Sequence, residues 1–557
     1  MIRDSQTHPL RIDAVSVPGT GGLIGMTICP GKKQAESFSG GWNRDLRTDL
    51  DTISAWNAEI LVSLIEPHEY SRVGVDLLHS LVPESMLHLQ LPIKDVSVPD
   101  AAWEEVWKLK GRLVRSVLRR GGRVCLHCMG GLGRTGMIAA LLLVELGMDP
   151  DTAIISVRSA RQDTIETPEQ EQYIRSHGNL SRRIHKYRGC LLGGAVGDAL
   201  GAPVEFMAKE TIFERFGPAG VRNFEPNAYG PIGAITDDTQ MTLFTAEGLL
   251  RTYVRGTLRS LASFSGCVHH AYLRWLKTQG FSSKVQELRM DGWLIGHQGL
   301  FARRAPGTTC ISALEAASGF GIPESARNDS KGCGGVMRAA PVGLYASSMP
   351  APVEERRLWA FETGCKVAAL THGHPSGYFP AGVLAVIVLE LLEDSSLLDA
   401  LGTAKKILTG RPGCEETLWA IEKAETLAMS DTASSIAIEA LGEGWVGEEA
   451  LSIAVFCSLR AASFEEGIIN AVNITGDSDS TGSIAGNILG ARFGTQAIPQ
   501  RWSDTIELRE VVLSLADDLA SFGKWFLDTI FQLDMKDLEC KLKKADMEWW
   551  INRYPGW

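Results

Sequence analysis

A cysteine and an arginine six residues apart form the most reactive arrangement in the chain. The run from Val124 to Gly136 reads VCLHCMGGLGRTG and joins an apolar, strand-like segment to an apolar, helical one. Loop glycines allow successive backbone N–H groups to point inward, and the positive end of the following helix adds to their field. Such a loop binds a tetrahedral phosphate dianion and stabilises a thiolate. We therefore expect Cys128 to be a nucleophile that attacks phosphorus and forms a phosphocysteine intermediate.

The neighbours of Cys128 suit the same reaction. The planar fork of Arg134 matches two phosphate oxygens, and Thr135 is placed to donate a hydrogen bond to the sulfur. His127 is expected to fix the loop by hydrogen bonding rather than to act as a base. The remaining loop residues are expected to line the phosphate: Met129, Gly130, Gly131, Leu132 and Gly133.

The leaving oxygen of a phosphate ester needs a proton, which a carboxylic acid on another loop can supply. Asp95 lies between two prolines in the run PIKDVSVPD, where a loop is expected, and is the first choice. Asp100 is the alternative. Gln170 is a candidate for orienting the water that hydrolyses the intermediate.

Two other interpretations of this cysteine are open to the sequence. Cys128 would be a buried structural thiol if the glycines only made a turn, but the flanking histidine, threonine, strand and helix favour the functional interpretation. Cys125 and Cys128 also form a C-x-x-C pair, which suggests zinc or thioredoxin chemistry. No second pair is spaced to complete a zinc site nearby, and a protective reversible disulfide is a further hypothesis.

These residues resemble the dual-specificity branch of the protein tyrosine phosphatase superfamily. The runs PGKK at Pro30 and WNRDL at Trp42 are similar to the branch typified by the cyclin-dependent-kinase-associated phosphatase. The resemblance covers roughly residues 20–178 and implies that Cys128 is the nucleophile, Arg134 the phosphate clamp and Asp95 the general acid. Members act on phosphotyrosine, phosphothreonine, lipids and RNA ends, so the substrate does not follow.

Two short acidic runs lie far apart in the second part of the chain. One is Thr236-Asp237-Asp238-Thr239 and the other holds Asp477, Asp479 and Ser480, each just ahead of an apolar helical segment. Helix capping explains one carboxylate or hydroxyl in each run but not the others. If the runs converge, four like charges require hard cations, and oxygen donors favour Mg²⁺ or Mn²⁺. Two ions, typically about 3.5–4 Å apart, would balance them.

Glycines predict how the runs converge. Gly189, Gly193, Gly197 and Gly201 recur at every fourth residue, and so do Gly482, Gly486, Gly490 and Gly494. Each glycine costs a helix about 1 kcal/mol relative to alanine, so the pattern needs a packing reason. We expect the two helices to approach closely and to bring the region of Asp198 and Glu205 to the second acidic run.

Five segments in this part resemble the ADP-ribosylglycohydrolase family, related to the dinitrogenase-reductase-activating glycohydrolase. They are GGAVGDALGAPVE at Gly193, TDDT at Thr236, GCGGVMR at Gly332, THGHP at Thr371 and GDSDS at Gly476. The resemblance runs from about Tyr187 to about Gly523 and implies an all-α domain with a binuclear Mg²⁺ or Mn²⁺ site. Its ligands would be Thr236, Asp237, Asp238, Asp477, Asp479 and Ser480, the last being threonine in many relatives.

The same resemblance implies further roles. Glu205 would lie beside the ribose, handling a water or gating the site, and Asp198 would contribute to substrate binding. Gly334 and Gly335 would bind the diphosphate through backbone N–H groups. His372 would be either a ligand contact or a structural histidine at a helix start. The bond at C1″ of the ribose would break through an oxocarbenium-like state.

The pattern of elements divides the chain in two. Up to about residue 180, strand-like runs such as Ile60–Ile65 and Arg123–Leu126 alternate with amphipathic stretches, which predicts an α/β domain over residues 1–180. After the polar, basic segment from Gly178 to Arg188 the strand signal nearly vanishes, so residues 181–557 are expected to be all-α. The charged, tryptophan-rich stretch from Phe526 on is expected to be a terminal helix packed on this second domain.

Composition bears on the partners and the cellular compartment that we expect for this protein. A net charge of −11 does not indicate a general nucleic-acid-binding surface. Eleven scattered cysteines suit reduced thiols in the cytoplasm, and no signal-peptide pattern opens the sequence. The apolar window Ala381–Leu392 is shorter than a membrane span and reads as a buried helix.

Retention of the chemical residues in both halves favours a bifunctional hydrolase acting on phosphorylated and ADP-ribosylated proteins or small molecules. In one alternative, one half is a binding module that reads phosphate or ADP-ribose without turnover. In another, both halves process a single phosphorylated ADP-ribose-type metabolite.

Overall fold

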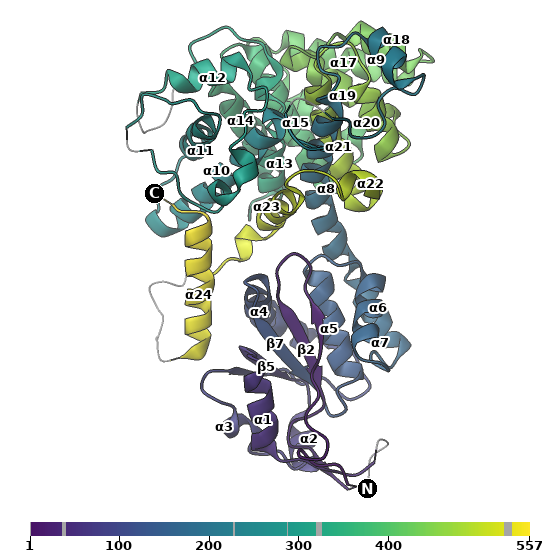
Figure 1. Cartoon of the computed structure of the whole chain (residues 1–557), viewed down its shortest axis with the longest axis vertical. Helices are drawn as coiled ribbons and strands as arrows, with labels where there is room; N and C mark the ends of the chain where they lie inside the picture. Colours follow the sequence, from purple (N-terminus) through teal and green to yellow (C-terminus); the bar gives the residue numbers. More distant parts are fainter. Residues whose placement is uncertain are drawn as a thin grey trace. The chain divides into compact units, whose positions relative to one another are not determined.

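A computed structural model describes residues 2–35, 40–226, 229–286, 288–318, 326–527 and 537–556 (Figure 1). The chain forms two compact units. The first comprises Met1–Arg183 and Lys524–Trp549, and the second comprises Ile184–Gly523 and the residues from Trp550 on.

The first unit is built on a five-stranded sheet with the order β1-β2-β7-β5-β6. Its strands are β1 (Asp13–Ser16), β2 (Leu23–Thr27), β5 (Ile60–Ser63), β6 (Leu87–Gln90) and β7 (Arg123–His127). All neighbours are parallel except β1 and β2, which are antiparallel. Because β7 lies in the middle, the residue that follows its carboxyl end is surrounded by the ends of β2 and β5. Parallel sheets place ligand sites at such an edge.

Helices complete this unit, together with a two-stranded ribbon of β3 (Lys33–Gln34) and β4 (Trp42–Asn43). The helices are α1 (Leu46–Ala55), α2 (Pro67–Arg72), α3 (Leu78–Leu81), α4 (Ala101–Arg119), α5 (Gly133–Glu145), α6 (Pro150–Ala160) and α7 (Pro168–Ser176). Glu145 ties α4 to α5, since its carboxylate accepts from Trp107 at 3.0 Å and pairs with Arg115 at 2.6 Å. The predicted α/β fold is confirmed.

The second unit is helical throughout its described residues, as predicted. It begins in α8 (Gly178–Gly201), which contains the unit boundary. The helices that follow are α9 (Lys209–Phe216), α10 (Asp237–Arg259), α11 (Phe264–Thr278), α12 (Thr308–Glu315), α13 (Ala340–Ser347), α14 (Val353–Ala369), α15 (Pro375–Leu392), α16 (Leu397–Leu408), α17 (Glu415–Met429), α18 (Ser434–Leu441), α19 (Gly447–Arg460), α20 (Phe464–Val472), α21 (Ser478–Phe493), α22 (Gln500–Ser503) and α23 (Arg509–Ser521).

Helix α15 is the core of the second unit. It packs against α13, α14, α16, α19 and α21. Within the described residues it is also the one helix long and apolar enough to cross a membrane, yet 89% of that window is buried inside the protein. Its apolar surface is thus already covered by the surrounding helices.

The polar segment from Gly178 forms the start of α8, and the unit boundary follows Arg183, within the segment where the boundary was expected. The C-terminal end of the chain differs from the expectation. The C-terminal stretch was expected to pack on the second domain, but Lys524–Trp549 groups with the first unit. Arg112 explains part of this, because its guanidinium donates to the carbonyl oxygens of Lys524 and Trp525 at 2.6 Å and lies 4.0 Å from the ring of Phe526.

Candidate functional sites: a phosphate loop and an acidic centre

The cysteine loop lies at the carboxyl end of β7. Cys128 follows the strand directly and is 4% exposed, and the loop ends where α5 begins at Gly133. The N–H group of Gly131 donates to the sulfur of Cys128 at 3.2 Å. Gly131 has φ +71°, and a Cβ there would collide with the backbone of Thr27. A glycine is therefore required at the point where the loop turns over the sulfur.

Arg134 is buried and already paired. Its guanidinium donates to both carboxylate oxygens of Glu69, at 2.6 and 3.0 Å, and lies 2.9 Å from a carboxylate oxygen of Asp95. Burial alone would lower the pKa of Arg134, but its hydrogen bonds to Glu69 and the charges of Cys128, Glu69 and Asp95 raise it. The arginine is thus held charged and oriented before any phosphate arrives.

The two candidate acids occupy different places. Asp95 reaches Arg134 and its side chain is 49% exposed, so it is free to face an incoming substrate. Asp100 caps α4, where its carboxylate accepts from the N–H of Trp103 at 2.8 Å. Of the two acids, Asp95 is the one that contacts a residue of the cysteine motif within the described part of the chain. Val96 follows it with φ +55°, a conformation that costs a branched residue free energy.

His127 supports the loop from behind. Its Nε2 lies 2.5 Å from the hydroxyl of Ser63, which lies 2.7 Å from Nε2 of His88. Burial lowers the pKa of His127 to about 3, so the ring is neutral. A neutral, fully buried imidazole within a hydrogen-bond chain matches the expected structural role.

Thr135 and Gln170 flank the start of α5. The hydroxyl oxygen of Thr135 is buried and makes no hydrogen bond among the described residues, which leaves it available to the sulfur. Gln170 is buried against Gly133, where an added Cβ would lie 3.1 Å from both amide atoms. Its side-chain oxygen accepts from the N–H of Glu166 at 2.9 Å. Gln170 therefore lies next to the loop, where a water-orienting residue is needed.

Cys125 lies within β7, in register with Gly25 and Leu61. It is fully buried, and burial raises its pKa to about 12. These features suit a core thiol rather than a metal ligand.

Three loop-contacting residues were missed from the sequence. Glu69 orients Arg134, and the guanidinium of Arg161 donates to the carbonyl oxygen of Gly131 at 2.7 Å while pairing with Asp13 at 2.7 Å. The ammonium of Lys32 donates to the carbonyl oxygen of Met129 at 3.4 Å. Each comes from a segment distant from the cysteine motif. Lys32 stands in the PGKK run that carries the resemblance, but nothing in that run shows that its side chain reaches the loop.

In the second unit, α8 and α21 pack through their glycines. Cβ atoms at Gly189, Gly193 and Gly197 would collide with the backbone carbonyls of Gly490, Gly486 and Gly482. The helices therefore touch backbone to backbone, which only glycine permits. This confirms the approach predicted from the glycine spacing.

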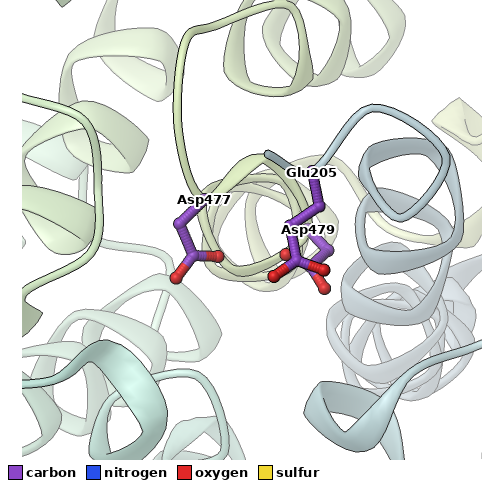
Figure 2. A group of neighbouring side chains, drawn as sticks. All are labelled: Glu205, Asp477 and Asp479. Carbon is purple, nitrogen blue, oxygen red and sulfur yellow. The ribbon is translucent and has the colours of Figure 1, made fainter. Parts of the chain in front are cut away.

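This packing brings the end of α8 to the start of α21. One carboxylate oxygen each from Glu205, Asp477 and Asp479 lie within 4.8 Å of one another (Figure 2). Both acidic runs also cap their helices: Thr236 accepts from the N–H of Asp238, and Asp477 from that of Ser480. Capping thus accounts for one residue in each run and leaves the other carboxylates unexplained.

The remaining carboxylates are buried and short of partners. Asp237 accepts one hydrogen bond, from the N–H of Gly307 at 3.3 Å. Oδ2 of Asp238 and Oε2 of Glu205 are buried and have no hydrogen-bond partner among the described residues. Burial raises the pKa of Asp237 and of Glu205 to about 8, with the charge of Asp477 adding to both shifts. Burial and neighbouring charges likewise hold the pKa of Asp238 and of Asp479 well above the usual range.

Asp198 serves a different purpose. Its carboxylate accepts from the N–H groups of Thr236 at 3.0 Å and Thr239 at 3.1 Å, and from the hydroxyl of Thr239. Asp198 therefore holds the start of α10 in place. In this geometry it would act on a substrate through Thr236 and Thr239, which it positions.

The glycine loop of η3 (Cys333–Gly335) borders the acidic centre. The thiol of Cys333 donates to Asp477 at 2.7 Å, and the hydroxyl of Ser480 lies 3.6 Å from the same sulfur. A Cβ at Gly334 would lie 3.1 Å from the ring of His372, and burial lowers the pKa of His372 to about 3. His372 thus supports the loop as a neutral side chain. A Cβ at Gly335 would lie 2.5 Å from the carbonyl oxygen of Gly377.

Family models match both halves of the chain. Residues 179–526 match the model described as ADP-ribosylglycohydrolase. The chain belongs to the ADP-ribosylglycohydrolase family. Residues 42–148 match a model described as a polymorphic toxin system DSP-PTPase phosphatase. Both parts are therefore related to hydrolases, as the sequence motifs predict.

Individual relatives agree with this division. An uncharacterized protein of Archaeoglobus fulgidus is 29% identical over 338 residues, covering 60% of this chain and 95% of that protein. ADP-ribosylhydrolase ARH3 of Mus musculus is 27% identical over 374 residues, which cover 61% of this chain and 92% of that protein. A probable protein tyrosine phosphatase type IVA B of Dictyostelium discoideum is 33% identical over 84 residues, which cover 14% of this chain and 50% of that protein.

The sequence analysis also did not predict an exposed aromatic pair beside the acidic centre. Phe206 follows Glu205 with φ +66°, is 69% exposed and stacks on Trp445 with ring centroids 5.2 Å apart. The carbonyl oxygen of Trp445 accepts from the N–H of Cys333 at 3.2 Å. Two planar rings therefore lie at the rim of the acidic centre. Neither residue stands in a motif, and only the fold brings them together.

Proposed function

We propose that the chain is a bifunctional hydrolase, with an ADP-ribosyl glycohydrolase in the second unit and a cysteine phosphatase in the first. One observation carries the first activity: six acidic side chains converge in a buried centre, and burial raises the pKa of all six. Repulsion by neighbouring carboxylates adds to the shift in four of them, Glu205, Asp237, Asp238 and Asp479. Such a cluster is costly unless cations complete it.

The donor set fits two Mg²⁺ or Mn²⁺ ions. It offers carboxylate and hydroxyl oxygens, including the buried and unpartnered Oδ2 of Asp238. The ligands would be Thr236, Asp237, Asp238, Asp477, Asp479 and Ser480. The ions, when bound, polarise ribose hydroxyls and a water.

Side chains and backbone groups of the protein would transfer the proton, position the metal ligands and bind the diphosphate. Glu205, with its raised pKa, is suited to exchange a proton with the attacking water near neutral pH. Asp198 holds Thr236 and Thr239 in place, and Cys333 orients Asp477 through its thiol. The backbone of Gly334 and Gly335 would bind the diphosphate.

The test is release of ADP-ribose from ADP-ribosylated arginine, serine and small-molecule substrates, with and without Mg²⁺ or Mn²⁺. Metal-dependent release is expected from the wild type and from Cys128→Ser. It should be lost in Asp477→Ala/Asp479→Ala and retained in Asp431→Ala, an exposed control. No release from any substrate by folded, metal-loaded protein would overturn the proposal.

The phosphatase proposal rests on the contact between the N–H of Gly131 and the sulfur of Cys128, beside a prepositioned Arg134. Cys128 would attack phosphorus and displace the ester oxygen, which takes a proton from Asp95. A bound phosphate competes with Asp95 for Arg134 and so frees the acid. Gln170 would then orient the water that releases phosphate from the sulfur.

Hydrolysis of p-nitrophenyl phosphate tests this step. Cys128→Ser should lower the rate by more than about a thousandfold, as loss of a nucleophile does elsewhere. Mass spectrometry of acid-quenched wild type should find the phosphate on Cys128. Equal rates for wild type and Cys128→Ser would contradict the mechanism.

A further inference from the structure

Lys32 places a buried ammonium group beside the cysteine loop. The residue is 5% exposed, and its Nζ donates to the carbonyl oxygen of Met129, the neighbour of Cys128, at 3.4 Å. Burying an ammonium is costly unless negative charge or several acceptors surround it. One long hydrogen bond leaves donors of Lys32 unused.

The turn that carries Lys32 is firmly held. The N–H of Gly31 donates to Asp49 at 2.8 Å, and Arg44 pairs with Asp49 through two hydrogen bonds of 2.7 and 2.8 Å. The N–H of Arg44 in turn donates to the carbonyl oxygen of Lys32 at 3.1 Å. All three anchoring residues are buried, so Lys32 is directed to the loop by a rigid support.

A count of charges shows why a second cation is needed. Arg134 is matched by Glu69 and Asp95, so the positive charge at the loop is already balanced. A phosphate dianion arriving there would meet no net positive charge from Arg134 alone. Among the described residues, none places a carboxylate within ion-pair distance of the ammonium of Lys32, so no direct ion pair compensates its charge. Burial lowers the pKa of Lys32 by more than the nearby charges of Cys29, Cys128 and Asp95 raise it.

We propose that Lys32 is a second phosphate-binding cation of the cysteine loop. Its ammonium contacts a non-bridging phosphate oxygen, while Arg134 binds two others. The inference rests on the proposed phosphatase activity and deepens it, because it assigns the positive charge that no direct ion pair compensates to a residue outside the cysteine motif. The charged and ionisable side chains around Lys32 are Cys29, Cys128, Arg72 and Asp95.

Tungstate, a phosphate-like oxyanion, provides a test that does not need turnover. Calorimetric titration of the full chain should show binding that weakens about ten- to a hundredfold in Lys32→Met, the loss typical of one charge-assisted hydrogen bond. Lys33→Met is the matched control, since Lys33 is adjacent and exposed and should bind like wild type. Lys32→Arg should recover part of the affinity.

Each outcome decides the matter. Equal tungstate affinity in wild type and Lys32→Met would overturn the role of Lys32 while leaving the phosphatase intact. Lys32→Gln provides a second substitution, and thermal unfolding of each variant shows whether a loss reflects misfolding. If wild type binds no tungstate and hydrolyses no p-nitrophenyl phosphate, the phosphatase proposal fails and the role of Lys32 fails with it.

Discussion

The two sites handle buried charge in opposite ways. At the cysteine loop, the buried Arg134 is matched by Glu69 and Asp95 at 2.6–3.0 Å. Burial raises the carboxyl pKa of Glu69, but the hydrogen bonds from Arg134 and from the N–H of Glu66, together with the charge of Arg134, lower it by more. In the acidic centre no cation faces Asp237 or Asp238 among the described contacts, and their pKa values rise. The ion pairs of Arg134 are complete within the chain, whereas the carboxylates of the acidic centre lack a matching cation until metal ions bind.

The backbone shows what the sites share. In each, the residue directly after the proposed acid has a positive φ without being glycine: Val96 after Asp95 and Phe206 after Glu205. Such conformations cost free energy and persist where surrounding structure imposes them, frequently at functional sites. Both acids are thus presented on strained loops, although one faces a completed ion pair and the other faces like charge.

The largest effect should follow from breaking the completed pair. Glu69→Gln leaves Arg134 buried with only part of its partner charge, so the free energy of unfolding of the first unit should fall by about 3 kcal/mol. Glu84→Gln, an exposed control, should change it little. Chemical denaturation followed by peptide-resolved hydrogen exchange separates the two units. A change below about 0.5 kcal/mol would show that the pair is not important to this unit.

The second largest effect should come from adding metal ions, which supply the positive charge that the acidic centre lacks and the cysteine loop does not require. Mg²⁺ or Mn²⁺ should stabilise the second unit by about 2.7 kcal/mol at a hundred times the dissociation constant and should leave the first unit unchanged. The expected stabilisation disappears in Asp477→Ala/Asp479→Ala. Equal stabilisation of both units would indicate nonspecific ion binding and would remove the distinction between the sites.

The sequence predicted the parts of each site that lie in one segment. The cysteine loop, the acidic runs and the glycine faces of α8 and α21 each follow from local spacing. The structure brings the two glycine faces into contact and places Glu205 beside Asp477 and Asp479. Capping and packing rules act over short stretches, so they can be read from a sequence.

Partners from distant segments escaped prediction. Glu69 meets Arg134, and Cys333 meets Asp477, across separations of 65 and 144 residues. Nothing in the sequence around Glu69 distinguishes it from any other glutamate in a helix. The C-terminal stretch was expected on the second domain, but only its residues from Trp550 on group with the second unit, and Lys524–Trp549 group with the first. The contacts of Arg112 with Lys524 and Trp525 leave no local pattern that predicts this.

The pH dependence of stability should have opposite signs in the two units. In EDTA, Glu205 and Asp237 bind protons in the folded state up to a pKa of about 8, whereas unfolded carboxyls release them near pH 4. The folded second unit therefore holds more protons between these values, and its stability should fall as pH rises from about 5 to 8. The slope is at most about 1.4 kcal/mol per pH unit for each proton.

Glu69 should behave in the reverse manner. Its pKa is lowered, so its contribution to the first unit is present above the ordinary glutamate value and is lost as pH falls through the folded one. Denaturation of each unit in EDTA at several pH values between 4 and 8 checks both signs. A second unit that is more stable at pH 8 than at pH 5.5 without metal would contradict the lack of a matching cation in the acidic centre.

The smallest effect is the most direct test of that centre. Asp238→Asn keeps nearly the same shape and removes a carboxyl whose pKa is held well above its usual range in the folded state. It should therefore stabilise the metal-free second unit by about 1 kcal/mol, because folding no longer has to protonate this group, while weakening Mg²⁺ or Mn²⁺ binding. The opposite signs of the two changes are diagnostic, because ordinary loss of a buried hydrogen bond would destabilise the metal-free form as well. Asp431→Asn on the surface is the control. Destabilisation of metal-free Asp238→Asn would mean that the carboxylates satisfy one another, as Glu69 and Arg134 do.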